Sequence, residues 1–363
     1  MTSTSLKSQQ GLLVLATIFA ISLLYFSYHL TRETQSAVTT LNQDDGLLPP
    51  ATAPARHNLH LGYLQFGQIL VVNRPQRTDR RESISLAAAY KNMRLDWIPG
   101  ISGSDILAST IPLAKDQDPP PEAAVIARNL SSALIMEDDM DWDIRIHNQL
   151  RDFAASTRAL LQPLASDPNS FADLSYPEPL PIIGVTNIPF EKIPDTVPPA
   201  SSLYEDGWDV LWLGHYGISM VAPDNPTHSK GRVVHKNDLT VPLRSKLDMG
   251  GGPNTLIGDY PDHTRVILHV DGGVCSTAYA VSQRGARRIL WEMSVNRYTS
   301  PVDVMLHELC NGQRELKLTC LTITSNSDIS HHGDGWRDIG KSSDIRWSMR
   351  MNMPEPFKGD TND

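Results

Sequence analysis

The chain has 363 residues, 40% of them hydrophobic, and a formal net charge of −9 at pH 7. A chain of this length and composition can bury one large hydrophobic core or two ordinary ones, which excludes a protein that is disordered throughout. The acidic balance argues against nucleic acid as a partner, because a surface that binds phosphate backbones normally carries an excess of Lys and Arg.

The N-terminal residues differ in kind from the rest. Residues 11–30 form an apolar run that is long enough to span a membrane. Its Leu, Ile, Val and Phe residues favour insertion by about 3–7 kcal/mol before the polar interruptions are counted. A cleaved signal peptide is the alternative, but its apolar region usually has only about 7–15 residues. Lys7 precedes the run, which predicts a cytosolic N-terminus.

We therefore expect a single-pass type II membrane protein of the Golgi or endoplasmic reticulum. Residues 1–10 form a short cytosolic tail and residues 11–30 the transmembrane signal anchor. Residues 31–66 are polar and rich in small residues and proline, which predicts a flexible stem. Residues 67–350 are expected to form a compact lumenal domain, followed by a disordered tail at residues 351–363.

Within this domain, short β-branched or apolar runs alternate with helix-like stretches. Strands are expected at residues 68–73, 95–98, 133–137, 208–214 and 277–281. Helices are expected at residues 82–93, 143–161, 283–293 and 301–310. The alternation predicts an α/β fold in which helices cover a central sheet.

Two long connections lack such patterns. Residues 162–202 contain nine prolines and are predicted to be an insertion, either a lid or a disordered segment. Residues 222–263 are polar and are predicted to form a second large loop.

Three adjacent carboxylates, Glu137, Asp138 and Asp139, end an apolar run. Burying like charges without a cation is costly, and ligands of open α/β sheets bind where the strands end. Hard oxygen ligands suit Mg²⁺ or Mn²⁺. Strand alternation places Glu137 and Asp139 on one face and Asp138 on the other, until the chain turns. A solvated acidic turn without a metal is the alternative.

Polar residues also follow the first predicted strand. Asn73 is placed to hydrogen-bond a nucleotide, or it is only a turn former. Arg77, Arg80 and Arg81 can donate paired hydrogen bonds to phosphates or to acidic groups, or they form an exposed cluster at a helix start. Asp209, in a later predicted strand, is expected to be a structural acid.

The cysteines and one sequon bear on the compartment. A bridge between Cys310 and Cys320 fits an oxidising compartment and leaves Cys275 alone, although a free pair in the core is the alternative. Asn129-Leu130-Ser131 is an N-glycosylation sequon. It lies just before a predicted buried strand, which argues against its use.

The order of these segments resembles glycosyltransferase family 25, which includes lipopolysaccharide and collagen galactosyltransferases. The resemblance covers residues 69–323 and is closest to fungal members. The matching segments are Val72-Asn73 with Arg77, Asp79, Arg80 and Arg81; Ala133 to Asp139; Trp208 to Gly214; Tyr279 to Ser282 with Arg284-Gly285-Ala286; Pro301-Val302-Asp303; and His331-His332.

The resemblance implies a GT-A-like nucleotide-diphospho-sugar transferase fold, with a mixed central sheet and helices on both faces. It also implies inverting transfer of a sugar such as galactose from a UDP-sugar to a glycan or glycoprotein acceptor, with Mn²⁺ or Mg²⁺ bound. An inverting transfer needs a carboxylate that takes the proton of the acceptor hydroxyl. We assign this role to Asp303, with Glu308 in reserve; a structural role of Asp303 as a helix N-cap is the alternative.

The remaining roles follow from the same comparison. Glu137, Asp139, His331 and His332 are the candidate metal ligands; the two histidines are candidates by analogy with other GT-A enzymes. The candidate residues for binding the donor are Asn73, Arg77, Arg80, Arg81 and Asp138.

One departure from the family pattern keeps other functions open. Family members usually carry a Gly-x-x-Gly-Cys-x-x-Ser-His helix before the acidic strand, and residues 107–128 contain no such motif. A catalytically impaired relative that serves as a lumenal binding or scaffold protein is therefore an alternative. A metal-dependent hydrolase that uses the same acids and histidines is another.

Overall fold

The computed structural model describes residues 64–102, 121–200, 202–246, 258–296, 299–324, 329–331 and 348–349. The expected anchor, nearly all of the stem, and the tail lie outside these ranges. Within the described ranges, no helix combines the length and apolar character needed to cross a bilayer. Leu64 and Phe66, which were assigned to the stem, are core residues. The compact domain therefore includes residues before the expected start at residue 67.

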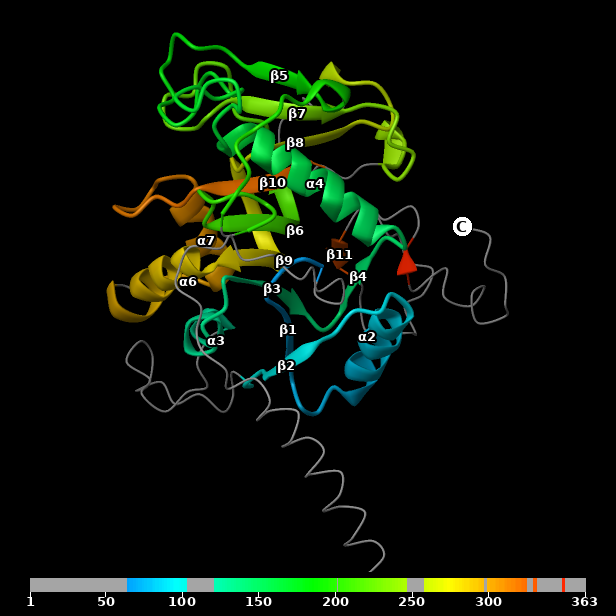
Figure 1. Cartoon of the computed structure of the whole chain (residues 1–363). Helices are drawn as coiled ribbons and strands as arrows, with labels where there is room; N and C mark the ends of the chain where they lie inside the picture. The colour runs from blue at the N-terminus through cyan, green and yellow to red at the C-terminus, as the bar shows by residue number, and fades with distance from the viewer. Residues whose placement is uncertain are drawn as a thin grey trace, which may run out of the picture. The chain divides into compact units, whose positions relative to one another are not determined.

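Nine strands form one mixed sheet in the order β2-β1-β3-β9-β6-β10-β8-β7-β5, running from bottom to top in Figure 1. Parallel pairing joins β1 to β2 and β3, β6 to β10, and β5 to β7; the other neighbours are antiparallel. The nine strands are β1 Gln68–Asn73, β2 Asp96–Pro99, β3 Ser132–Glu137, β5 Thr186–Pro189, β6 Val210–Ile218, β7 Gly231–His235, β8 Arg265–His269, β9 Gly272–Ser282 and β10 Cys320–Thr324. A second, two-stranded sheet pairs β4 (Met140–Trp142) with β11 (Ile329–His331).

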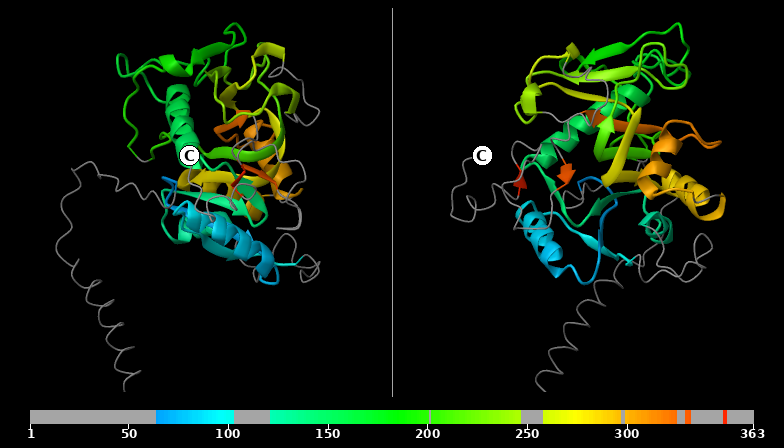
Figure 2. Two further views of the ribbon diagram at one scale, coloured as in Figure 1. Left: turned by 90° about the vertical axis from the view of Figure 1, so that its right-hand side faces the viewer. Right: turned by 180° about the vertical axis from the view of Figure 1, so that it is seen from behind.

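Helices cover both faces of the large sheet, because alternate residues of each strand point to opposite sides. On one side, Leu134 and Met136 pack with residues of α2 and α4; on the other, Ile135 and Val281 pack with residues of α3, α6 and α7. The views in Figure 2 show α4 and α7 on opposite sides of the sheet. The helices are α2 Thr78–Tyr90, α3 Pro121–Ala127, α4 Ile146–Leu161, α6 Gln283–Leu290 and α7 Val302–Cys310. The predicted α/β class is confirmed.

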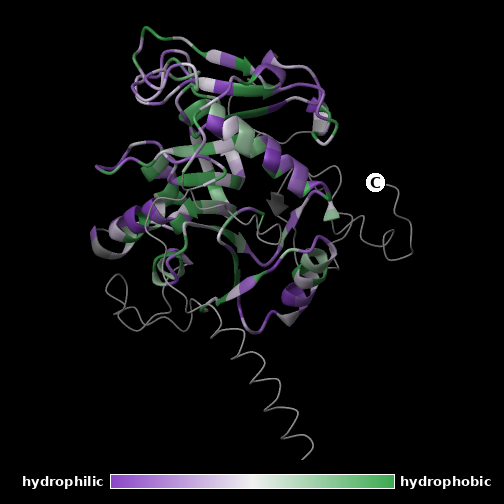
Figure 3. Cartoon of the chain, viewed as in Figure 1, coloured by the Kyte–Doolittle hydropathy of each residue, from purple (hydrophilic) through white to green (hydrophobic). Residues whose placement is uncertain are grey.

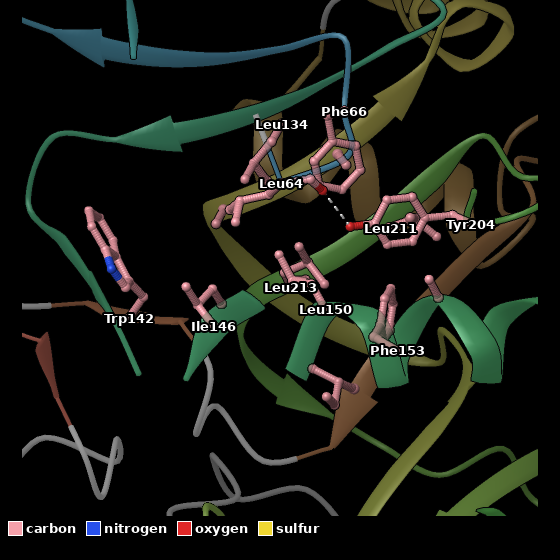
Figure 4. Packing of buried hydrophobic residues seen from close by; sticks show 14 of the residues in the cluster. Leu64, Phe66, Leu134, Trp142, Ile146, Leu150, Phe153, Tyr204, Leu211 and Leu213 are labelled. Carbon is pink, nitrogen blue, oxygen red and sulfur yellow. Dashed lines mark hydrogen bonds between the residues drawn. The ribbon is translucent and has the colours of Figure 1, made fainter. Parts of the chain in front are cut away.

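Apolar side chains concentrate in the central strands (Figure 3). The core beside α4 also takes in residues from outside the main strands (Figure 4). Tyr204 stacks on Phe66 with ring centroids 4.5 Å apart. Its hydroxyl donates a hydrogen bond to the carbonyl oxygen of Leu64 at 2.9 Å. A buried hydroxyl needs such a partner, so this contact fixes the entry of the chain into the domain.

Residues 162–200 of the proline-rich insertion have a defined structure, which disagrees with the alternative of a disordered segment. It supplies β5, which extends the sheet by pairing with β7. The fully buried Asp173 ties the segment down by accepting hydrogen bonds from the backbone amides of Ser175 (2.9 Å) and Gly231 (3.0 Å). Prolines do not oppose this arrangement, because β5 is an edge strand, where a missing N–H is tolerated.

The second expected loop, residues 222–263, contains β7, which the sequence pattern did not predict. Its run Gly-Arg-Val-Val-His has only two adjacent apolar residues. Arg232 is nevertheless buried, because its guanidinium donates to the carbonyl oxygen of Val221 at 2.7 Å. The helix expected at residues 283–293 also differs: α6 ends at Leu290 and continues as a short π-helix, Trp291–Asn296.

Candidate functional site

The carboxyl ends of β1 and β3 lie side by side at one edge of the sheet. β1 has parallel neighbours on both sides, and Val72 of β1 is in register with Glu137 of β3. The chain passes from β1 to β2 on one side and later to β3 on the other, which makes this edge a topological switch point. In open α/β sheets, ligands bind in the crevice at such points.

Four side chains meet at this edge, and we call them the edge cluster: Asn73, Arg80, Asp138 and Asp139. The Asn73 amide donates to Asp138 Oδ2 at 2.7 Å. One guanidinium nitrogen of Arg80 lies 2.9 Å from Asp138 Oδ1 and 2.8 Å from Asp139 Oδ2. Both aspartates are buried, with exposed fractions of 6% and 4%. Two buried carboxylates therefore share one arginine.

The charges of the edge cluster act on Arg80. Partial burial alone would lower the pKa of its guanidinium, but the hydrogen bond to Asp138 and the charges of both aspartates outweigh this and raise the pKa. Arg80 therefore stays charged and is shared by the two carboxylates.

A turn brings Asp138 and Asp139 together. β3 ends at Glu137, and residues 138–139 form a tight turn into β4. Strict alternation would have separated the two aspartates onto opposite faces, as the sequence predicted for an uninterrupted strand. The turn instead lets both reach Arg80 on α2.

The two other predicted arginines have partners of their own. Arg77 pairs with Asp79 at 2.8 Å, and this hydrogen bond holds the pKa of Asp79 at about 2. Arg81 lies over the ring of Trp97, 4.4 Å from its centroid, as a cation–π contact. Both arginine side chains therefore make contacts within the protein.

Asp303 contacts Cys275, and the charge of Glu137 also acts on the Cys275 thiol; we call these three residues the α7 group. Asp303 Oδ2 accepts a hydrogen bond from the Cys275 backbone amide at 3.1 Å. Burial raises the pKa of the Cys275 thiol, and the charges of Asp303 and Glu137 raise it further. Asp303 is not the N-cap of α7, because Pro301 occupies that position. Its carboxylate instead accepts a hydrogen bond from the backbone of Cys275, a residue with a positive φ of +64°.

Two further side chains, one and two turns after Asp303, also contact the start of β9. His307 Nδ1 lies 2.8 Å from the carbonyl oxygen of Gly273, and Asn311 Oδ1 accepts from the Gly272 amide at 3.2 Å. Residues four apart share one face of a helix, so Asp303, His307 and Asn311 hold the start of β9 as a unit. Glu308 points elsewhere, since it pairs with Arg314 at 2.7 Å.

The predicted histidines can be placed only in part. β11 pairs with β4 so that the backbone of His331 lies opposite Met140, the residue after Asp139. The His331 side chain and all of His332 lie outside the described residues. Over the residues that the structure describes, no three His, Cys, Asp or Glu side chains are grouped so that they could hold a metal ion.

A second set of polar contacts, which we call the clasp, joins two of the segments that carried the family resemblance. Asp209 is fully buried and pairs with Arg284 at 2.8 Å and with Arg288. A Cβ on Gly285 would lie only 2.2 Å from the Asp209 carbonyl oxygen, so the close approach of α6 requires glycine. The expectation that Asp209 is structural is confirmed. Its two arginine partners were not predicted as such.

No protein-family model matches this chain. No curated protein sequence matches it either.

Proposed function

We propose that this protein is a metal-dependent inverting glycosyltransferase with a GT-A-like fold, which moves a sugar such as galactose from a UDP-sugar to a glycan or glycoprotein. The observation that carries the proposal is the edge cluster. Two buried aspartates share one arginine at the switch point of the sheet, where a ligand is expected. Carboxylates grouped at this edge are the kind of ligand that a divalent metal ion carrying a nucleoside diphosphate would use.

The carboxylate oxygens of the edge cluster fit Mg²⁺ or Mn²⁺, which prefer hard oxygen ligands. Asp139 and Asp138 would hold the ion, and β11 brings the backbone of His331 beside them. When bound, the ion would neutralise the charge that develops on the departing nucleoside diphosphate. Arg80 and Asn73 keep the two carboxylates in position by direct hydrogen bonds.

Asp303 is the proposed base. The Cys275 amide binds one of its oxygens and thereby orients the carboxylate. It lies in the first turn of α7, next to the start of β9. A carboxylate held in this way can accept the proton of an acceptor hydroxyl as the new glycosidic bond forms.

The disulfide supports a lumenal placement. Cys310 and Cys320 are bonded and buried, and they join the end of α7 to the start of β10. Disulfides of this kind persist in oxidising compartments such as the lumen of the endoplasmic reticulum. This observation agrees with the proposed N-terminal anchor at residues 11–30 and with a Golgi or endoplasmic reticulum location.

The proposal is tested by measuring UDP release from a panel of UDP-sugars with and without Mn²⁺, using simple glycans as acceptors. We expect turnover that requires Mn²⁺ and is lost in Asp139→Ala. The Asp262→Ala variant is the control, because Asp262 is exposed, pairs with Arg244 and lies outside the edge cluster. Absence of Mn²⁺-dependent release with every UDP-sugar contradicts the proposal, and cleavage of a phosphoester without any nucleotide sugar indicates a hydrolase instead.

A catalytically impaired binding protein is the second candidate, and one observation favours it. Arg80 already contacts both aspartates, so the protein itself supplies part of the positive charge that a metal would bring. Thermal stabilisation by UDP and Mn²⁺ without turnover distinguishes this candidate from an active transferase.

A further inference from the structure

We infer that Asn129 carries an N-linked oligosaccharide. Asn129-Leu130-Ser131 is the only Asn-x-Ser/Thr triplet of the whole sequence in which the middle residue is not proline. The one other triplet, Asn225-Pro226-Thr227, is excluded by its proline. The inference concerns a modification of the protein and is separate from the reaction that it catalyses.

The structure removes the objection that the sequon adjoins a buried strand. β3 begins at Ser132, one residue after the sequon, and the sequon itself lies in the connection between α3 and β3. Asn129 and Ser131 are both exposed. Asn129 has a φ of +51°, a left-handed conformation that Asn tolerates in turns. An exposed turn is the setting that a glycan requires.

The hydrogen bonds of Asn129 leave the reacting atom available. Its Oδ1 accepts from Gln283 Nε2 at 3.0 Å, and the same Gln283 nitrogen donates to the Leu130 carbonyl oxygen at 3.1 Å. Glycosylation uses the other atom, Nδ2. This nitrogen loses one proton and bonds to the anomeric carbon of a lipid-linked oligosaccharide, while the bond from that carbon to the diphosphate oxygen breaks and the polyprenyl diphosphate leaves. The contact with Gln283 is compatible with the product.

The attachment point lies at the opposite end of β3 from the edge cluster. Asn129 precedes the first residue of the strand, whereas Asp138 and Asp139 follow the last. A strand rises about 3.3 Å per residue, so the six residues of β3 separate the two places by roughly 20 Å. A glycan at Asn129 therefore leaves the proposed donor site open, and its removal should leave UDP release unchanged.

The inference rests on the lumenal placement within the proposed function, and not on sugar transfer. The buried Cys310–Cys320 disulfide supports that placement independently of the sequon. N-linked transfer takes place in the compartment where such disulfides form.

The test is to express the full chain in a eukaryotic secretory host and treat it with peptide N-glycosidase. We expect one step of mass loss in the wild type and none in Asn129→Gln or Ser131→Ala. Peptide mass spectrometry should locate the Asn-to-Asp conversion that the enzyme leaves at Asn129.

A matched control comes from the turn after β7. Asn237 is also exposed and has a similar φ of +58°, and Leu239 is 60% exposed, so Leu239→Thr creates a new sequon in a comparable setting. The double variant Asn129→Gln with Leu239→Thr should regain one step of mass loss. If the double variant loses mass but the wild type does not, the chain reaches the lumen and the inference about Asn129 is wrong. If neither the wild type nor the double variant loses mass, the lumenal placement is wrong as well. The UDP-release assay tests the transfer activity separately.

Discussion

The clasp and the edge cluster both pair buried carboxylates with arginine, but in opposite ratios. In the clasp, the single carboxylate of Asp209 meets two guanidinium groups and the backbone amide of Thr319 at 2.9 Å. In the edge cluster, two carboxylates meet one guanidinium, that of Arg80. The clasp thus gathers two arginines on one carboxylate, and the edge cluster gathers two carboxylates on one arginine.

The difference separates a structural contact from a candidate site. A buried carboxylate that is fully paired holds elements together and gains nothing from a ligand. A pair of buried carboxylates with one shared cation is stabilised by any further cation that can reach it. The positions agree with this view, because the clasp fastens the start of β6 to α6, whereas the edge cluster lies where β1 and β3 end.

The largest expected effect concerns Asp303, which belongs to neither group. Asp303→Asn keeps an oxygen that accepts from the Cys275 amide, but it cannot take a proton. We expect kcat/KM for transfer to fall by roughly 10²–10⁴-fold, the usual contribution of a general base. Steady-state assays with a UDP-sugar measure this, and unchanged binding of UDP shows that the fold is intact. A variant with full activity excludes Asp303 as the base.

The clasp should control stability rather than binding. Asp209→Ala leaves Arg284 and Arg288 without their shared carboxylate, and removing one partner of a buried pair typically costs about 3–5 kcal/mol. The arginine side chains are 51% and 31% exposed, so water compensates part of the loss. We expect the free energy of unfolding in urea to fall by about 2–3 kcal/mol. A change as small as that of a surface substitution contradicts the structural role of the clasp.

The disulfide should contribute a comparable amount of stability that does not depend on a ligand. Cys310 and Cys320 are ten residues apart, and closing so short a loop stabilises by about 2–3 kcal/mol in the chain-entropy description. The double variant Cys310→Ala with Cys320→Ala should lose this amount in chemical denaturation, with the response to UDP retained. Loss of the UDP response alone, at unchanged stability, contradicts a purely structural bridge.

The pH dependence of stability should reveal Glu205, which precedes the clasp. Burial raises the pKa of this carboxyl from 4.5 to about 8, against the opposing hydrogen bonds from Gly207 and Trp208. Between these values the folded state binds a proton that the unfolded state releases, so the stability falls as the pH rises, by up to about 1.4 kcal/mol per unit.

Unfolding in urea at pH 5, 6.5 and 8 measures this slope. The isosteric Glu205→Gln variant has no such proton to lose, so its profile should lack that contribution and cross above the wild type toward pH 8. Parallel profiles of the two proteins exclude Glu205 as the source.

The sequence predicted the fold better than it predicted contacts within the site. β1, β3 and α4 were expected because continuous apolar runs and helical periodicity are local signals. β7 was missed because its signal is short, and β8 was omitted although Val266, Ile267 and Leu268 form a usable apolar run. Which strands pair is decided by contacts between distant residues, and one sequence does not contain that information.

The residues of the edge cluster were identified correctly as candidates, but their partners were not. Asn73 and Asp138 are 65 residues apart, and Arg80 and Asp138 are 58 apart. Their meeting depends on the turn at residues 138–139, which ends the alternation of β3. Glu137, the last residue before this turn, acts by its charge on Cys275 in the α7 group. The order of motifs predicted which residues are candidates for the site. The structure assigns them to two groups, the edge cluster and the α7 group.

The most direct test of the edge cluster as a nucleotide-sugar site is thermal stabilisation by UDP with Mn²⁺, measured on the wild type and on Asp139→Ala. A ligand at a hundredfold excess over Kd stabilises the folded state by about 2.7 kcal/mol. The variant keeps Arg80 paired with Asp138, and the shift of each protein is measured against its own stability without ligand. We predict a clear shift in the wild type and none in Asp139→Ala. An equal shift in both proteins, or no shift in the wild type with any nucleoside diphosphate, contradicts the assignment.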